Sequence, residues 1–206
     1  MTPPVIEVTV GTDISKSNNL RSVPVADVFV LAALIGRGAM HVSKLHPSLH
    51  TQADWLALPK SLKKEEPGLS RDRLKVKGNY LLAGHIAGSH RAVTAVDRVG
   101  LLVVDLDEGD LTEAEIRQRV GKHGAVFFET ANSAPENKRW RLIMLLAREL
   151  TAENYRDAVK AWALSWGAAL DACSTRPAQP QLLPLSFDDY TPQVYLHDGE
   201  RLALHE

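Results

Sequence analysis

The sequence predicts an α+β fold whose second half runs strand, helix, strand, strand, helix, strand. Residues 101–106 (LLVVDL) form a mostly apolar run of strand length, which is typical of a central strand covered on both faces. Residues 112–121 begin with a Thr and Glu three positions apart, a capping box, and end with Gly, so they predict a helix. Residues 151–170 carry apolar side chains at helical spacing and predict a longer helix.

The first part of the chain, residues 1–98, is predicted to form a small N-terminal α/β lobe. Alternating apolar side chains predict a strand over residues 5–10. Pro24 suits the first position of a helix over residues 25–35, and Gly36 is expected to end that helix.

The rest of this lobe is less regular. Residues 41–68 hold three prolines around one short predicted helix, 51–58, and are expected to be largely exposed and mobile. Residues 73–83 are expected to be extended, and residues 84–90 to form a glycine-punctuated loop.

Residues 99–206 are predicted to form a second unit, integrated with the lobe into one domain. Strands over 125–130, 139–146 and 181–185 complete the order β-α-β-β-α-β, the split βαβ unit of ferredoxin-like or RRM-like folds. A right-handed crossover makes the first two strands parallel, and this fold places the third strand beside the first, antiparallel to it, with the fourth at a sheet edge. The end of strand 101–106 is therefore expected beside the beginning of strand 139–146.

The amino-acid composition is that of an ordinary globular protein and excludes several other classes. The chain has 206 residues, 45% hydrophobic and 24% charged, which excludes disorder, collagen and coiled coil. Its 24 Lys and Arg against 25 Asp and Glu give a net charge of −1, so any phosphate binding must be local. A single cysteine predicts a reducing, cytoplasmic location. The longest apolar stretch, residues 28–35, is far shorter than the roughly 20 residues of a membrane helix, so no membrane association is expected.

Two carboxylates are predicted to share one face at the end of strand 101–106. Side chains two apart on a strand point the same way, so Asp105 and Asp107 are expected to lie together. Their repulsion and desolvation would cost several kcal/mol, roughly, unless a cation neutralises them, and Mg²⁺ or Mn²⁺ prefers carboxylate oxygen. The alternative is that this Asp-x-Asp opens a solvated turn, the more common role of such a pair in isolation.

Two arginines are predicted to face these carboxylates. Arg139 and Arg141 share one face of the strand over 139–146, and Trp140 belongs to the other, core face. Guanidinium groups beside a carboxylate-bound metal ion suit a nucleoside triphosphate, because the metal bridges phosphate oxygens and the arginines neutralise the rest. The alternative is internal salt bridging of the arginines to Asp105, Asp107 or a third carboxylate, Glu129.

Other polar groups are weaker candidates. Lys60, Lys63 and Lys64 form a basic run that could contact a nucleic-acid backbone, although such a run is more often a solvated surface. The eight histidines are expected to have surface or local hydrogen-bonding roles, with His90, beside Arg91, the exception of interest.

Several segments, in their order and spacing, resemble the primase-polymerase domain of phage and plasmid replication proteins, in the archaeo-eukaryotic primase superfamily. The resemblance runs from about Asp13 to Leu185. Its segments are residues 15–19, 90–91, Arg98, 103–107, 130–135, 138–143, 170–171, 177–179 and Pro184.

The resemblance implies an RRM-like palm packed with an N-terminal lobe, and nucleotidyl transfer from an NTP or dNTP to a 3′-hydroxyl on a DNA template. Asp105, Asp107 and Asp171 would be catalytic and hold Mg²⁺ or Mn²⁺. The nucleotide-binding residues implied are Arg139, Arg141, Arg91 and Thr130. Nucleoside triphosphates, a DNA template and primer, and a helicase domain or protein are the implied partners.

The chain departs from this family at two places. Relatives carry histidine after the second strand of the palm, where this chain has Ala131 and Ser133, and arginine where it has Gln179. An alternative is therefore a catalytically weakened or inactive nucleic-acid-binding module of replication initiation with the same fold. A metal-dependent nuclease is a third possibility. Residues 193–205 are expected to begin a further element.

Overall fold

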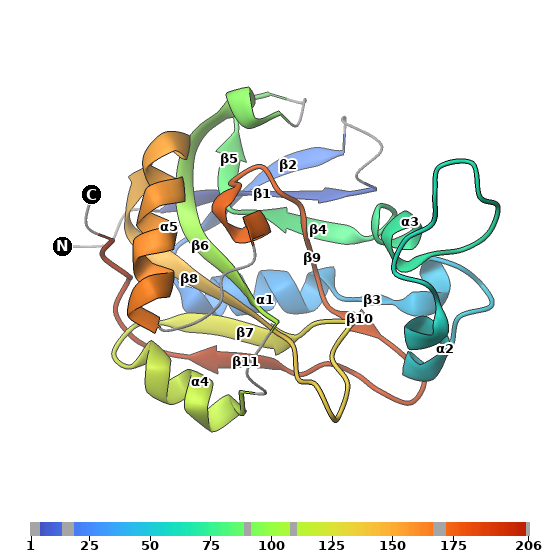
Figure 1. Cartoon of the computed structure of the whole chain (residues 1–206). Coiled ribbons are helices and arrows are strands. Elements are labelled where there is room, and N and C mark those ends of the chain that lie inside the picture. The colour runs from blue at the N-terminus through green and yellow to red at the C-terminus, as the bar shows by residue number, and fades with distance from the viewer. Residues whose placement is uncertain (1–4, 14–18, 89–91, 108–110, 167–171, 205–206) are drawn as a thin grey trace.

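The computed structural model describes residues 5–13, 19–88, 92–107, 111–166 and 172–204, and has a mixed α+β fold built mainly from two antiparallel sheets (Figure 1). One sheet has the strand order β2-β1-β4-β9 and the other the order β11-β7-β8-β6-β5. The predicted α+β class is confirmed.

The five-stranded sheet contains the three strands whose relative placement the sequence predicts. Its members are β5 (Gly84–Ile86), β6 (Val96–Leu106), β7 (Ala125–Glu129), β8 (Trp140–Leu150) and β11 (Val194–His197). Strand β8 lies between β6 and β7 and is antiparallel to both, so β6 and β7 are parallel to one another. Asp105 of β6 stands opposite Arg141 of β8 in this register. The end of β6 and the beginning of β8 therefore meet, as predicted.

The fourth predicted strand is placed differently. Residues 181–185 divide into β9 (Gln181–Leu182) and β10 (Leu185–Ser186) around Pro184, which has no N–H to donate to a sheet. Strand β9 is an edge strand of the other sheet, next to β4, and β10 pairs with β3 (Met40–His41). The place beside β6 belongs to β5, which the sequence predicted to be a loop. The fourth strand is thus at a sheet edge, as expected, but in the sheet of the first half.

In the first half of the chain, the structure differs from the prediction in the place of Pro24 and in the bounds of the first helix. Strands β1 (Ile6–Thr12), β2 (Leu20–Val25) and β4 (Asn79–Leu82) build its sheet, and Pro24 lies in the edge strand β2, where its missing N–H is tolerated. Helix α1 (Val28–Gly38) starts after Asp27, whose side chain accepts a hydrogen bond from the Val30 N–H at 2.9 Å. The predicted helix 25–35 therefore begins and ends three residues later.

The four other helices follow local capping signals. Helices α2 (Gln52–Ala57) and α4 (Glu113–Val120) each begin with a capping box, and α5 (Ala152–Trp166) begins at Thr151. Helix α3 (Arg71–Lys75), capped by Ser70, replaces the start of the predicted extended segment. The expected helix residues 167–170 and the expected loop residues 89–90 lie outside the described residues.

The core has a main part and a satellite. In the main part α5 packs on β6 and β8, whereas α1 packs on β7 and β11. Trp140 is 3% exposed and Trp162 is 8% exposed, so the predicted core roles of these residues are confirmed. The satellite core joins buried side chains around α2, α3 and β10: Val42, Leu45, Leu49, Trp55, Leu74, Ala131, Leu185 and Phe187.

Most of residues 41–68 are exposed, as expected, but Val42, Leu45, Leu49 and Trp55 are buried in the satellite core. This segment holds a 3₁₀ turn at Val42–Lys44 and helix α2, and Trp55 is fully buried. Figure 1 shows α2 and α3 together at one end of the molecule, beside β3 and β10. The predicted division between a lobe of residues 1–98 and a unit of residues 99–206 stays a prediction. Strand β5 lies before residue 98 but belongs to the sheet of the second half. Among the described helices, none is long and apolar enough to cross a membrane.

Candidate functional site

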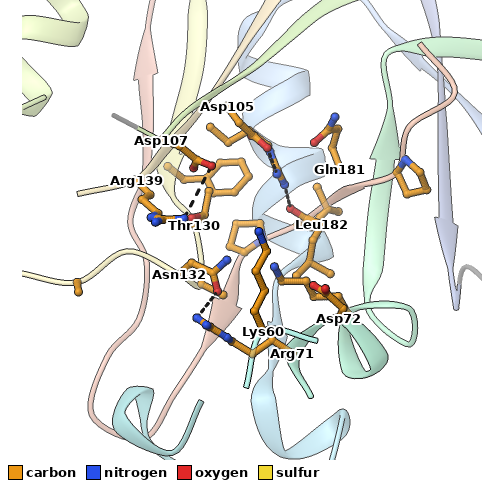
Figure 2. A pocket seen from close by; sticks show the side chains of 18 of the residues that line it. Lys60, Arg71, Asp72, Asp105, Asp107, Thr130, Asn132, Arg139, Gln181 and Leu182 are labelled. Atoms are coloured by element: carbon orange, nitrogen blue, oxygen red, sulfur yellow. Dashed lines mark hydrogen bonds and ion pairs between the residues drawn. The ribbon is translucent and has the colours of Figure 1, made fainter. Parts of the chain in front are cut away.

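The predicted acidic and basic groups of the two central strands line one cavity of about 530 Å³ (Figure 2). Asp105 lies at the end of β6 and Asp107 directly follows that strand, while Arg139 directly precedes β8 and Arg141 lies at its beginning. Val104 and Leu106 are buried on the opposite side of β6, as strand alternation requires. The strand register therefore brings both clusters to the same place.

Asp105 and Arg141 form a two-point ion pair inside this cavity. The Arg141 Nε donates to Asp105 Oδ1 at 2.6 Å, and Nη2 donates to Oδ2 at 2.8 Å. The side chain of Arg141 is only 10% exposed and that of Asp105 only 15%. Arg141 Nη1 also donates to the carbonyl oxygen of Leu182, and the Asp105 backbone N–H donates to Ser174 Oγ at 3.2 Å. This is the internal salt bridge that the sequence left open as an alternative.

Asp107 and Arg139 form a looser and more exposed pair. Arg139 Nη1 lies 3.8 Å from Asp107 Oδ2, and the side chains are 33% and 43% exposed. The Nε atom of Arg139 is buried and has no hydrogen-bond partner among the described residues. This guanidinium thus retains an unused donor at the cavity wall.

Glu129, the third predicted partner of the arginines, is engaged elsewhere. Lys138 Nζ donates to Glu129 Oε1 at 2.7 Å, and Ser133 Oγ donates to Oε2 at 2.7 Å. Burial by itself would raise the pKa of Glu129, but hydrogen bonds from Lys138, Ser133 and Tyr190 hold that pKa below its ordinary value. Glu129 is therefore ionised, and its carboxylate holds the turn between β7 and β8 through these hydrogen bonds.

This turn connects β7 and β8 to the satellite core. Ala131 is 6% exposed and packs in the satellite core. Asn132 Oδ1 accepts hydrogen bonds from Trp55 Nε1 at 3.3 Å and Arg71 Nη1 at 3.2 Å. Gln52 Nε2 donates to the carbonyl oxygen of Ser133 at 2.8 Å. The segment in which similar domains carry histidine here holds α2 and α3 against the strands.

Because α3 is held there, it contributes a second, basic wall that the sequence reasoning missed. Lys60, Arg71 and Lys75 line the cavity together with Asp72. Figure 2 shows Lys60, Arg71 and Asp72 across the cavity from Asp105 and Asp107. The sequence signal for this wall is Ser70, which can cap a helix. In a helix that begins after Ser70, Arg71 and Lys75 are four residues apart and lie on the same face.

The predicted basic run 60–64 is divided by the structure. Lys60 lines the cavity, whereas Lys63 and Lys64 do not and are exposed. The backbone carbonyls of Lys63 and Lys64 accept hydrogen bonds from Arg73 Nη2 at 2.7 Å and 3.4 Å. These two lysines project from a loop that Arg73 holds in place.

The remaining predicted residues divide into two groups. Thr130 lines the cavity, and its backbone N–H donates to the Arg139 carbonyl oxygen at 2.9 Å. Asp171, Arg91 and His90 lie outside the described residues. Within the described ranges, no group of three or more His, Cys, Asp or Glu side chains is arranged to hold a metal ion.

The histidines follow the expectation of local roles where they are described. His41 and His50 both contact Asp188, at 3.1 Å and 3.3 Å, and His197 hydrogen-bonds the carbonyl oxygen of Gly121. None of the described histidines lines the cavity.

Comparison with known proteins gives one family and one solved structure. Residues 39–179 match the model of the VapE N-terminal domain. The chain is similar to the archaeo-eukaryotic primase domain of the cyanophage S-2L primase-polymerase, with 12% identity, a TM-score of 0.45 and coverage of 64% of this chain and 70% of that one. At this TM-score the likeness places no residue of the site. No curated protein matches the chain.

The family model matches more than half of the chain. The family match spans α2, α3, the whole of β6 to β8 and α5, and so includes both walls of the cavity. The chain therefore belongs to the VapE N-terminal domain family.

Proposed function

We propose that this chain is a primase-polymerase domain that transfers a nucleotide from an NTP or dNTP to a 3′-hydroxyl on a DNA template, with release of pyrophosphate. The observation that supports the proposal is the shared cavity, in which Asp105 and Asp107 face cationic side chains from distant parts of the sequence. A cavity of about 530 Å³ is within the range of small-molecule sites. In this proposal β6, α4, β7, β8 and α5 act as the RRM-like palm, and residues 1–98 form the lobe packed against it.

Divalent cations fit the acidic wall. Asp105 and Asp107 supply hard oxygen donors, the ligands that Mg²⁺ and Mn²⁺ prefer, and we assign Asp171 as the third carboxylate. Arg141 uses one acceptor position on each oxygen of Asp105, and an ionised carboxylate has about four. When bound, the ions would supply stabilisation of the negative charge that develops on the reacting phosphate.

The arginines have separate tasks in the proposal. Arg141 orients Asp105 through its two-point contact, and two of its five N–H groups stay available for a phosphate oxygen. Arg139, which has an unused buried Nε donor, binds the nucleotide together with Arg91 and Thr130. The exposed Lys63 and Lys64 contact the DNA backbone, and Lys60, which lines the cavity, adds positive charge at the end of that basic run.

Primer extension tests this proposal. A labelled primer on a DNA template is incubated with the chain, dNTPs or NTPs, and Mg²⁺ or Mn²⁺. Extension by the wild type and its loss in Asp105→Asn and Asp107→Asn are expected. Asp157→Asn is the matched control, since Asp157 lies on α5 with a side chain that is 71% exposed. Shortening of the primer would instead indicate a metal-dependent nuclease.

Two observations favour a second candidate, a nucleic-acid-binding replication module of weak or no catalytic activity. The Asp105 carboxylate is already paired with Arg141, and the position of the family histidine is an alanine that packs in the satellite core. This candidate predicts DNA binding that is independent of metal ions, with no extension by the wild type. A helicase domain or protein would act beside either form.

A further inference from the structure

Lys75 is a half-buried cation on the wall of the cavity. It lies in the last turn of α3 and lines the cavity. Among the described residues, none forms a hydrogen bond or ion pair with its ammonium group. Burial lowers the pKa of Lys75, and the neighbouring charges act in both directions: Asp72 and Asp105 raise this pKa, while Arg141 and Arg71 lower it. Placing an ammonium group there costs free energy that the protein's own acids do not recover.

The acidic side chains near Lys75 are not placed to offset the free-energy cost of burying its ammonium group. Asp105 already binds Arg141 through both carboxylate oxygens. Asp72 is exposed at the rim, where water screens its charge. An anion that enters the cavity would therefore be the first close partner of Lys75.

Two further cations, Arg71 and Lys60, line the cavity together with Lys75. The backbone N–H groups of Arg71 and Asp72 donate to the carbonyl oxygens of Pro59 and Lys60, both at 3.0 Å, so the loop that carries Lys60 is tied to the first turn of α3. Arg71 is held by its contact with Asn132, and its Nε atom is buried without a hydrogen-bond partner among the described residues. Three cations are thus presented on one wall by backbone and side-chain hydrogen bonds.

We propose that Lys75, Arg71 and Lys60 bind the terminal phosphates of a nucleoside triphosphate whose reacting phosphate lies at Asp105 and Asp107. The inference rests on the proposed function and extends it, because it names residues outside the predicted site. A ligand that spans the two walls must carry several negative charges at one end and a metal-binding phosphate at the other. A nucleoside triphosphate meets both demands, whereas a monophosphate reaches only one wall.

The shape of the site favours a triphosphate over a nucleic-acid backbone. The three cations face into a concave cavity together with the two strand carboxylates, while the neighbouring Lys63 and Lys64 project outside it. A backbone site would be expected to follow the exposed run of lysines. We therefore expect the α3 wall to distinguish triphosphates from monophosphates.

The test compares Lys75→Gln with Lys77→Gln in the full chain. Lys77 is an exposed lysine two positions further on that does not line the cavity. Calorimetric titration with dATP, dAMP and inorganic tripolyphosphate is the readout. Lys75→Gln is expected to weaken dATP and tripolyphosphate binding by about 10-fold or more, the scale of one lost charge-assisted contact, and to leave dAMP binding unchanged. Lys77→Gln is expected to bind all three ligands as the wild type does.

A second variant covers the case in which Lys75→Gln does not fold. Lys60 is exposed, so Lys60→Gln is expected to fold and to weaken tripolyphosphate binding by about 3-fold or more, the lower end for a screened charge. Unchanged dATP affinity in Lys75→Gln, or in Lys60→Gln where the first variant is unfolded, would overturn the inference. So would a loss of single-stranded DNA binding in Lys75→Gln with dATP binding intact.

The inference and the proposed function fail separately. If the wild type extends primers and Lys75→Gln binds dATP normally, only the α3 wall is misassigned. If tripolyphosphate binding depends on Lys75 but the wild type extends no primer, the phosphate site stands and the polymerase activity does not. A wild type that binds neither dATP nor tripolyphosphate would overturn both.

Discussion

Asp105 and Arg141 face each other across the β6–β8 pairing and share two hydrogen bonds, at 2.6 Å and 2.8 Å, in a site where both side chains are nearly buried. The pair fixes the direction of the carboxylate that we assign to metal binding. It also connects the acidic wall to the carbonyl oxygen of Leu182, which belongs to β9 of the other sheet.

Arg141→Met is expected to destabilise the fold strongly, because it leaves the buried Asp105 carboxylate without its partner. Loss of one member of a buried pair costs about 3–5 kcal/mol of unfolding free energy. Arg139→Met is the matched control, since it removes the looser pair at 3.8 Å, which is worth about 0–1 kcal/mol. Urea unfolding of both variants measures the difference. Equal losses would mean that the Asp105–Arg141 pair is not a buried structural contact.

Glu129→Gln is expected to make the free energy of unfolding less dependent on pH in the acidic range. The hydrogen-bonded Glu129 has a lowered pKa, so its contribution is present above the pKa of the unfolded chain and is lost as pH falls through the lower folded value. The wild type should therefore lose stability more steeply than the variant between about pH 5 and pH 3. Thermal unfolding across that range gives the two slopes. Parallel curves would contradict the assigned pKa direction.

Lys75→Met is expected to stabilise the protein while weakening triphosphate binding. Because the folded pKa of Lys75 is lowered, the folded state is disfavoured below that pKa, and stability rises as pH increases from the folded towards the unfolded value. Removing the charge should raise Tm at neutral pH by about 2–4 °C for each kcal/mol gained. Scanning calorimetry measures this shift. A lowered Tm would show that the ammonium group has a structural partner in the folded protein.

Ala131→His, which restores the residue type of similar primase-polymerases, is expected to destabilise the chain. Ala131 is 6% exposed and packs in the satellite core, and overpacking such a site costs about 1–3 kcal/mol. Ala134→His is the control, since Ala134 lies in the same turn, lines the cavity and is only partly buried. Denaturant midpoints of the two variants test the prediction. A neutral Ala131→His would show that the satellite core has room for a larger side chain at this position.

The elements with strong local signals could be predicted from the sequence. The apolar run around Val103 predicted a central strand, and the capping box at Thr112 predicted α4, because burial on two faces and local hydrogen bonds leave direct traces in the chain. The position of β9 could not be predicted in the same way. A two-residue strand is defined by its partner, Tyr80 to Leu81 of β4, and not by its own periodicity.

The wall that carries the aspartates and arginines could also be predicted from the sequence. Side chains alternate between the two faces of a strand, and the pairing of two neighbouring strands places Asp105 opposite Arg141. The α3 wall could not be predicted in this way. Lys75 reaches the cavity because the hydrogen bond from Arg71 to Asn132 holds α3 to a turn 61 residues away in the sequence, and a contact of that kind has no local signal.

The most direct test of the two-walled nucleotide site is a crystal structure of the chain with Mn²⁺ and a non-hydrolysable dNTP analogue. The account predicts Mn²⁺ at Asp105 and Asp107 and the terminal phosphates within hydrogen-bond distance of Lys75 and Arg71. A nucleotide bound elsewhere, or Mn²⁺ bound without contact to either aspartate, would contradict it.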